Sequence, residues 1–327
     1  MQFRWRILLA CVWVLILLTV LDKLIRLRDA KEIEIIIQDH SFDQSAGADW
    51  KMVVDQRTQW LSDMCKSKKL WNDTHVSNMA LDNIFVLERH SILFCQTPDG
   101  ANDEWKKFLL VLSGAYSSME EVPEDVVHNE TSLPRLSSLT SEEITHRLKN
   151  DFKFFIVRDP FERLISTFED KFLFTKPSEP WFKYTIGPAI VRKYRKYFPY
   201  RNEYGLHFDE FVQYLVDEVG RKSLDWRFGH HVAHWASYVE LCAPCDIRYD
   251  VIGHLETLKQ DADLILRDAG IEQLIFPGIA HYNKSVVERY LSGISKRDLR
   301  RLYKRYQGDF HLFGYRTPEL LLNGHAE

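Results

Sequence analysis

The chain has 327 residues, with 45% hydrophobic and 28% charged side chains and a formal net charge of −4. This length exceeds that of a minimal binding module and fits one α/β domain with appendages, or two smaller domains. The composition supports a sizeable core and excludes bulk disorder and collagen-like structure. The slightly negative charge gives no global argument for nucleic-acid binding, and five cysteines are too few for a disulfide-built miniprotein.

An uncharged, apolar run occupies residues 7–21 and has basic side chains on both flanks. At 1.5 Å per residue it covers about 22 Å, which is short for a hydrocarbon core of about 30 Å, but flanking basic side chains extend such a span by snorkelling. A cleaved signal peptide is the alternative, although no small-residue cleavage site follows the run. We therefore predict a cytoplasmic tail over 1–6, a transmembrane signal anchor over 7–21 and a charged stem over 22–48.

The orientation of this anchor depends on features beyond it. Positive charges after the run outnumber those before it, so the positive-inside rule does not favour a cytoplasmic N-terminus. Three N-glycosylation triplets, at Asn72, Asn129 and Asn283, and an even number of cysteines after the anchor favour that orientation instead. We therefore predict a type II membrane protein whose domain over 49–327 lies in the lumen.

Beyond residue 49, strand-like and helix-like segments alternate, which predicts an α/β domain with a mainly parallel sheet and flanking helices. The units that carry this prediction are a strand over 91–96 with a helix over 103–113, a strand over 154–157 with a helix to 172, and a strand over 249–253 with a helix over 257–269. A capping-box pattern over 295–298 predicts one more helix, which has Leu299, Leu302, Tyr303 and Tyr306 on one face.

The segment FKFFIVRDPFERLISTFEDKF, residues 152–172, is the strongest candidate for chemistry. Its apolar strand ends at Arg158, Asp159 is a favourable N-cap, and Pro160 suits the first helical position. Backbone amides and the helix dipole at such a junction attract anions, and a guanidinium adds a positive charge. The junction is therefore either an anion site or a capped helix whose arginine pairs with a carboxylate.

This segment also resembles the 3′-phosphate-binding motif of the Golgi carbohydrate sulfotransferases, in the group that contains the chondroitin and dermatan 4-O-sulfotransferases and the HNK-1 sulfotransferase. The family pattern Arg-Asp/Glu-Pro-Phe-x-Arg-Leu-x-Ser matches residues 158–166 throughout. Further stretches resemble the family in the same order, namely HW at 234–235, LCAPC at 241–245, YDVIG at 249–253, LETL at 255–258 and RLY to LFGY over 301–315. The likeness covers most of the chain beyond the anchor.

The resemblance implies a carbohydrate O-sulfotransferase of the Golgi lumen that takes its sulfuryl group from PAPS (3′-phosphoadenosine 5′-phosphosulfate) and needs no metal. It implies a glycan acceptor, such as the N-acetylgalactosamine of chondroitin. Arg158 and Ser166 are expected to hold the 3′-phosphate. The residues that the motif assigns to this part of the donor site are Arg158, Asp159, Pro160, Phe161, Glu162, Arg163, Leu164, Ile165 and Ser166.

The family's second motif is a P-loop-like turn that binds the 5′-phosphosulfate, and it is degenerate here. The pattern Cys-x-x-Pro-Lys-x-x-x-Thr-x-Trp-Lys falls on CQTPDGANDEWK, residues 95–106, so that Asp99 replaces the family's catalytic lysine and Asp103 replaces the threonine. A carboxylate about 4 Å from a donor charge costs about 4 kcal/mol at an effective dielectric constant of about 20, or about three decades in affinity. The residues assigned to this turn are Pro98, Asp99, Gly100, Ala101, Asn102, Asp103 and Glu104.

Two hypotheses follow from this turn. In the first, the chain is an active sulfotransferase in which another cation substitutes at the donor site, with Lys106 and Lys107 as candidates. In the second, it is a catalytically inactive, sulfotransferase-like binding protein of the lumen. Sulfate transfer from PAPS distinguishes the two.

Three further groups of residues are candidates for function. Cys242 and Cys245, near three histidines, form either a zinc site or, as a luminal chain favours, a disulfide, and Cys65 and Cys95 are candidates for a second bridge. His234 is either a general base for the acceptor hydroxyl or a buried structural histidine.

The stretch over 192–201 interleaves cations with aromatic rings, which in a luminal chain predicts a surface for an acidic glycan; a solvated helix face is the alternative. The residues predicted to bind the acceptor are Arg192, Lys193, Arg195 and Lys196. The sequence holds no Walker lysine motif, GxSxG or HExxH, so it gives no support to a nucleotide hydrolase, an esterase of that type or a zincin.

Overall fold

The computed structural model describes residues 46–67, 76–98, 102–129, 131–195, 205–271, 276, 284–318 and 321. The predicted tail, the anchor and the stem up to residue 45 lie outside the described residues. Within the described ranges, no helix is both long and apolar enough to cross a bilayer. Gly47–Glu327 clusters as one unit, to which all of the following elements belong apart from the first residue of α2.

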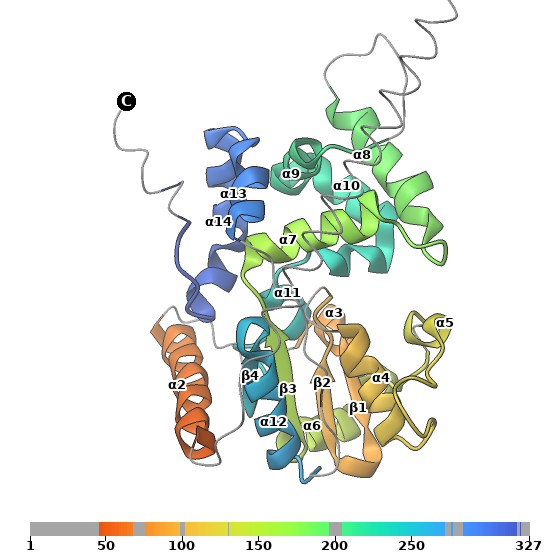
Figure 1. Ribbon diagram of the computed structural model, residues 1–327, viewed down its shortest axis with the longest axis vertical. Helices are drawn as coiled ribbons and strands as arrows, with labels where there is room; N and C mark the ends of the chain where they lie inside the picture. Colours follow the sequence, from red (N-terminus) through yellow and green to blue (C-terminus); the bar gives the residue numbers. More distant parts are fainter. Residues whose placement is uncertain are drawn as a thin grey trace, which may run out of the picture. The chain divides into compact units, whose positions relative to one another are not determined.

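A four-stranded sheet lies at the centre of this unit (Figure 1). The strands follow the order β1 (Ile84–Leu87), β2 (Ile92–Cys95), β3 (Phe152–Val157) and β4 (Val251–His254). β2, β3 and β4 are parallel, whereas β1 pairs antiparallel with β2 through the short η2 (Glu88–His90). The α/β prediction is therefore confirmed with a mixed sheet, in which β1 was not predicted and the other three strands were.

Both faces of the sheet are buried, because alternate side chains of each strand enter two different hydrophobic clusters. One face presents Phe85, Leu87, Ile92, Phe94, Phe154 and Ile156. The other presents Ile84, Val86, Leu93, Phe155, Val157 and Ile252. Burial on both faces explains why these strands read as continuous apolar runs rather than as alternating ones.

Helices cover each face of the sheet. Side chains of α4 (Asn102–Leu112) and α12 (Leu258–Asp268) pack in the first cluster. The opposite cluster receives side chains from α2 (Ala46–Ser67), α3 (Asn78–Asp82), η3 (Leu136–Ser138), α6 (Ser141–Asn150) and α11 (Tyr238–Cys242). The remaining short elements near the sheet are α5 (Glu124–Val127) and η7 (Leu255–Thr257). The predicted helices over 103–113 and 257–269 thus correspond to α4 and α12.

A second group of helices gathers beyond one end of the sheet (Figure 1). It comprises α7 (Pro160–Phe168), η4 (Glu169–Leu173), η5 (Phe182–Ile186), α8 (Gly187–Tyr194), α9 (Phe208–Val216), α10 (Glu218–Phe228), η6 (Gly229–His234), α13 (Lys284–Ser292) and α14 (Lys296–Leu312). These helices share a separate core cluster that includes Phe168, Phe211, Trp235 and Tyr306. α14 begins as predicted, since the side chain of Ser295 accepts a hydrogen bond from the Asp298 amide.

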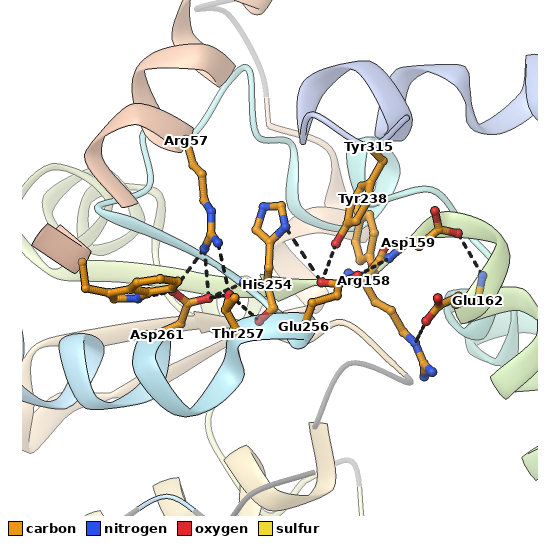
Figure 2. A network of polar contacts seen from close by, with 11 residues as sticks. Arg57, Arg158, Asp159, Glu162, Tyr238, His254, Glu256, Thr257, Asp261 and Tyr315 are labelled. Carbon is orange, nitrogen blue, oxygen red and sulfur yellow. Dashed lines mark hydrogen bonds and ion pairs between the residues drawn. The ribbon is translucent and has the colours of Figure 1, made fainter. Parts of the chain in front are cut away.

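Helix α2, the first helix of the described residues, is fixed to the sheet layer through Asp261 of α12 (Figure 2). The Asp261 side chain is fully buried. Its carboxylate accepts hydrogen bonds from Trp50 Nε1 at 2.9 Å and from Arg57 Nη1 at 3.0 and 3.1 Å. It also accepts from the His254 amide and from Thr257 Oγ1, both at 2.7 Å. One buried carboxylate therefore joins α2 to the carboxyl end of β4.

Asp309 of α14 is a second fully buried carboxyl group, and it gives the fold a pH dependence. It accepts hydrogen bonds from the backbone amides of Tyr238 and Val239 at 3.0 and 3.4 Å. Burial raises the pKa of Asp309 from 3.8 to about 7, so the folded chain retains a proton that the unfolded chain has released. The stability contributed by this proton is present below about pH 4 and is lost as the pH rises through 7.

We expect Asp309→Asn to remove this pH-dependent loss of stability, because an amide carries no charge and its oxygen can still accept the shorter hydrogen bond, from the Tyr238 amide. Thermal unfolding of the full-length chain between pH 4 and pH 8 checks this. The melting temperature of the variant minus that of the wild type should rise with pH. A difference that stays constant over this range contradicts the role assigned to Asp309.

Candidate functional site

The segment between β3 and α7 adopts the predicted capped junction. Asp159 is the N-cap residue, and its Oδ1 accepts hydrogen bonds from the Phe161 and Glu162 amides at 2.8 and 3.1 Å. Pro160 occupies the first helical position. Burial raises the pKa of Asp159, while these two backbone hydrogen bonds act in the opposite direction. Two backbone amides that we expected to be available to an anion therefore already donate to the Asp159 carboxylate.

Arg158 lies at the carboxyl end of β3 and is only 4% exposed (Figure 2). Its backbone N–H donates to the buried Tyr238 hydroxyl at 2.9 Å. Its Nε donates to Glu162 Oε2 at 3.4 Å, one helical turn further along. Burial raises the pKa of Glu162, and the Arg158 charge opposes that rise. The junction therefore has features of both interpretations of the sequence. A guanidinium lies at the end of a central strand, as an anion site requires, and it pairs with the carboxylate of Glu162, as in a capped helix.

Glu256 joins this junction to two distant segments (Figure 2). Its Oε1 accepts from the Asp159 amide at 3.2 Å, and its Oε2 accepts from the Tyr315 hydroxyl at 3.1 Å. His254 Nδ1 lies 3.9 Å from the same carboxylate. The LETL stretch, the C-terminal LFGY stretch and the Arg158 motif thus meet in space. The sequence placed these stretches in one family pattern but did not identify Glu256, Tyr238 or Tyr315 as neighbours of Arg158.

Six of the nine residues assigned to the 3′-phosphate are buried, and among them four side chains of α7 pack into the interior. Phe161, Leu164 and Ile165 belong to the helical core cluster. Arg163 is 1% exposed; its Nη2 donates to the carbonyls of Ala233, His234 and Ala236, and its guanidinium lies over the Tyr238 ring. The expectation that the Arg163 side chain faces a ligand is corrected, because the guanidinium instead supports the backbone over 233–236. Ser166 is half-buried on α7.

The turn between β2 and α4 is described only at its two ends. Thr97 Oγ1 donates to the Ile156 carbonyl at 2.6 Å, which ties the end of β2 to β3. Asn102, Asp103 and Glu104 form the first turn of α4, and burial raises the pKa of Glu104. Asp99, Gly100 and Ala101 lie outside the described residues. The phosphosulfate turn and its Asp99 therefore remain a prediction.

A cavity of about 580 Å³ opens beside this turn. Pro98, Asn102 and Asp103 line one side of it, and His230, His231 and His234 line another. Lys171, Glu179 and Trp181 also contribute, with Lys171 Nζ donating to Glu179 Oε2 at 2.7 Å. The predicted base His234 thus shares a cavity with the predicted donor turn. The sequence did not predict the part played by Lys171, Glu179 and Trp181.

The histidines of this cavity differ in their surroundings. His231 stacks on the Trp181 ring with centroids 4.9 Å apart, and burial lowers its pKa to about 3, so it is a weak base at neutral pH. His234 meets the Phe182 ring edge-on at 5.3 Å. The described residues contain no cluster of three or more His, Cys, Asp or Glu side chains suited to a metal ion.

The cysteines pair differently from the sequence prediction. Cys95 at the end of β2 bonds to Cys242, and Cys65 of α2 bonds to Cys245. The predicted Cys242–Cys245 bridge and the candidate Cys65–Cys95 bridge are therefore wrong, and the zinc alternative loses its thiol ligands. The reason is local: α11 ends at Cys242 and the chain turns through Ala243 in the left-handed conformation (φ 44°), so the two thiols reach different elements.

The predicted acceptor surface is partly neutralised by acidic neighbours. Arg195 donates to both Glu210 carboxylate oxygens, at 2.6 and 2.9 Å, so it adds no net positive charge to a surface. Lys193 donates to the Gly220 carbonyl at 2.7 Å, and Arg192 is exposed on α8. Lys196 lies outside the described residues. The prediction is corrected for Arg195, which holds α9 to the end of α8.

Of the three asparagines in glycosylation triplets, the structure describes Asn129. Its side chain is exposed, and its Oδ1 accepts hydrogen bonds from the Thr131 amide and hydroxyl, both at 2.9 Å. Asn72 and Asn283 lie outside the described residues. The geometry at Asn129 leaves the amide accessible at the surface, as a modified asparagine requires.

Comparisons with known proteins agree with the motifs. The model of the sulfotransferase family matches residues 82–316. Carbohydrate sulfotransferase 10 from Mus musculus and from Homo sapiens are 47% and 46% identical to this chain over 99% of it and 100% of their own length. Carbohydrate sulfotransferase 11 from Rattus norvegicus is 35% identical over 74% of this chain and 69% of its own length. No solved structure gives a significant match.

Proposed function

The chain belongs to the sulfotransferase family, and from this premise we propose that it transfers a sulfuryl group from PAPS to a hydroxyl group of a carbohydrate. The observation that carries the proposal is the adjacency of the two strands from which the two motif segments continue. β2 and β3 are parallel neighbours, with Phe94 opposite Phe154, so both motif segments leave the sheet from neighbouring carboxyl ends. A nucleotide with phosphates at both ends of its ribose bridges two such segments.

In this proposal, Arg158 binds the 3′-phosphate and Ser166 contributes from the next turns of α7. A phosphate group must displace Glu162 from the Arg158 guanidinium. It must also compete with the Asp159 carboxylate for the amides at the start of α7. The 5′-phosphosulfate lies at the turn between Pro98 and Asn102. Support for this placement comes from the buried position of Arg158, because a guanidinium in a low-dielectric site binds a phosphate more strongly than an exposed one.

The acceptor hydroxyl attacks the sulfur in line with the departing 5′-phosphate oxygen. One sulfur–oxygen bond forms while the other breaks, and the hydroxyl proton passes to a base, for which His234 is our candidate. The bridging oxygen stays on the 5′-phosphate of the product PAP (3′-phosphoadenosine 5′-phosphate) and takes up the negative charge that develops as the sulfur–oxygen bond breaks. Trp181 supplies a ring on which a sugar stacks, and the cavity that holds both residues is open beside the donor turn. We take chondroitin N-acetylgalactosamine as the first acceptor to test.

We further propose that the protein is held in the Golgi membrane by residues 7–21, with its C-terminal domain in the lumen. Two observations support this location. Both described disulfides join distant parts of the chain, and such bridges persist in oxidising compartments. Asn129 also presents a glycosylation triplet at the surface, where a luminal enzyme reaches it.

A second function is favoured by one observation, the aspartates at positions 99 and 103. Two carboxylates at the donor turn repel a dianionic donor, which suits a sulfotransferase-like binding protein without turnover. The two functions differ in a single assay, transfer of radiolabelled sulfate from PAPS to chondroitin by the full-length protein.

If the chain is active, the wild type transfers sulfate and Asp99→Lys increases the rate, because a cation at the donor turn stabilises the departing phosphate oxygen. A matched control is Asp125→Lys, which makes the same charge change at an exposed site on α5 and is expected to leave the rate unchanged. Absence of transfer by the wild type, together with its appearance in Asp99→Lys, favours the inactive binding protein. Absence in both proteins contradicts the proposed function for this acceptor and donor.

A further inference from the structure

A lysine from a distant segment lies against the aspartate that replaces the family's threonine. Lys176 Nζ is 3.6 Å from Asp103 Oδ2 in the first turn of α4. The same ammonium is 3.4 Å from His128 Nε2 and 3.9 Å from Glu124 Oε2. Lys176 belongs to the connection between η4 and η5, more than 70 residues beyond Asp103, so the fold alone brings the two charges together.

The two lysines that the sequence suggested as substitute cations have other partners, although Lys106 also lines this cavity. Lys106 is buried, and its ammonium donates to the carbonyls of Val127 and Asn129. Lys107 Nζ donates to Glu124 Oε1 at 3.2 Å. Neither arrangement places an ammonium against the Asp103 carboxylate. Lys176 is therefore a further candidate for the substitute cation at the donor site, and the sequence alone did not identify it.

We propose that Lys176 is the donor-site cation of this chain, which balances the charge of Asp103 and interacts with the 5′-phosphosulfate of PAPS. The proposal rests on the proposed function. Asp103 and His128 line the same cavity as Pro98 and Asn102, which are the described ends of the donor turn. A carboxylate at this position alone repels the donor, whereas Lys176 places an ammonium 3.6 Å from it, next to the cavity that Asp103 lines.

The side chains of Lys176 and Asp103 are 37% and 36% exposed, so solvent screens their attraction. The pair consequently contributes little to folding, and its partial exposure leaves the ammonium able to turn toward a ligand. The pair is thus suited to tuning donor affinity rather than to holding α4 in place.

The test is titration of PAP into the full-length protein by calorimetry. We expect Lys176→Ala to raise Kd about tenfold, Lys176→Arg to stay within about twofold of the wild type, and the Lys176→Ala effect to shrink as salt is increased. The control Lys149→Ala removes an exposed lysine from the last turn of α6 and should leave Kd unchanged. Melting temperatures of all variants are expected to match the wild type.

A double-mutant cycle separates charge compensation from a general electrostatic effect. In an Asp103→Thr background the carboxylate is gone, so Lys176→Ala should raise Kd by less than it does in the wild type. If the wild type binds PAP and Lys176→Ala binds it equally well, this inference is wrong while the proposed function stands. If the wild type itself does not bind PAP, the proposed function is wrong, and the inference about Lys176 is wrong with it.

Discussion

Replacing Arg158 with alanine is expected to weaken PAP binding about a hundredfold and to remove measurable sulfate transfer. Arg158 is nearly buried at the end of a central strand, and it is the cation that we assign to the 3′-phosphate. Truncating one member of a buried, hydrogen-bonded charge pair costs about 3 kcal/mol, which corresponds to about two decades in Kd. Calorimetric titration of PAP into the full-length variant measures the loss.

Two companion variants make this experiment specific. Glu162→Gln keeps the side-chain shape but removes the carboxylate that accepts from Arg158 Nε, so it should bind PAP at least as tightly as the wild type. Arg297→Ala removes an arginine whose side chain is 82% exposed and should leave Kd unchanged. Unchanged PAP affinity in a folded Arg158→Ala protein contradicts the assignment of the 3′-phosphate.

Removing the Cys95–Cys242 bridge by a double substitution to serine is expected to lower the free energy of unfolding by about 2–5 kcal/mol. The bridge spans 147 residues and ties the end of β2 to α11, so its loss releases a long loop in the unfolded chain. A domain of this kind has a total stability of about 5–15 kcal/mol, so the loss is a large fraction of it. Urea unfolding of the full-length protein, without reductant, measures the change.

Peptide mapping under non-reducing conditions tests the pairing itself. Cleavage after lysine and arginine places Cys65 on peptide 58–66, Cys95 on peptide 90–106, and both Cys242 and Cys245 on peptide 228–248. The structure predicts that these three peptides remain joined by two bridges. A free peptide 228–248 with an internal bridge would support the pairing expected from sequence and contradict the structure.

Local patterns allowed a good part of the fold to be predicted. The capped start of α7 at Asp159 and Pro160 was predictable, because an N-cap acts within three residues of its own position. The strands β2, β3 and β4 were predictable because each largely apolar segment is followed by a helical pattern. β1 is followed by η2 and β2 rather than by an α-helix, so the strand–helix pattern did not reveal it.

The parts that were missed depend on tertiary contacts. Arg158 and Arg163 belong to one motif and have identical chemistry, yet the Arg163 guanidinium donates to carbonyls over 233–236 and that of Arg158 to Glu162 of α7. The cysteine pairing likewise depends on which elements pack against α11. No local pattern places Lys176 beside Asp103, because the two residues meet only when the helical layer packs against the sheet layer.

The most direct test of the account is an experimental structure of the full-length protein with PAP bound. We predict that the 3′-phosphate lies within hydrogen-bond distance of the Arg158 guanidinium, and that the 5′-phosphate lies at the turn between Pro98 and Asn102. A nucleotide bound away from Arg158, with the Arg158–Glu162 pair intact, would contradict the central claim that this junction is the donor site.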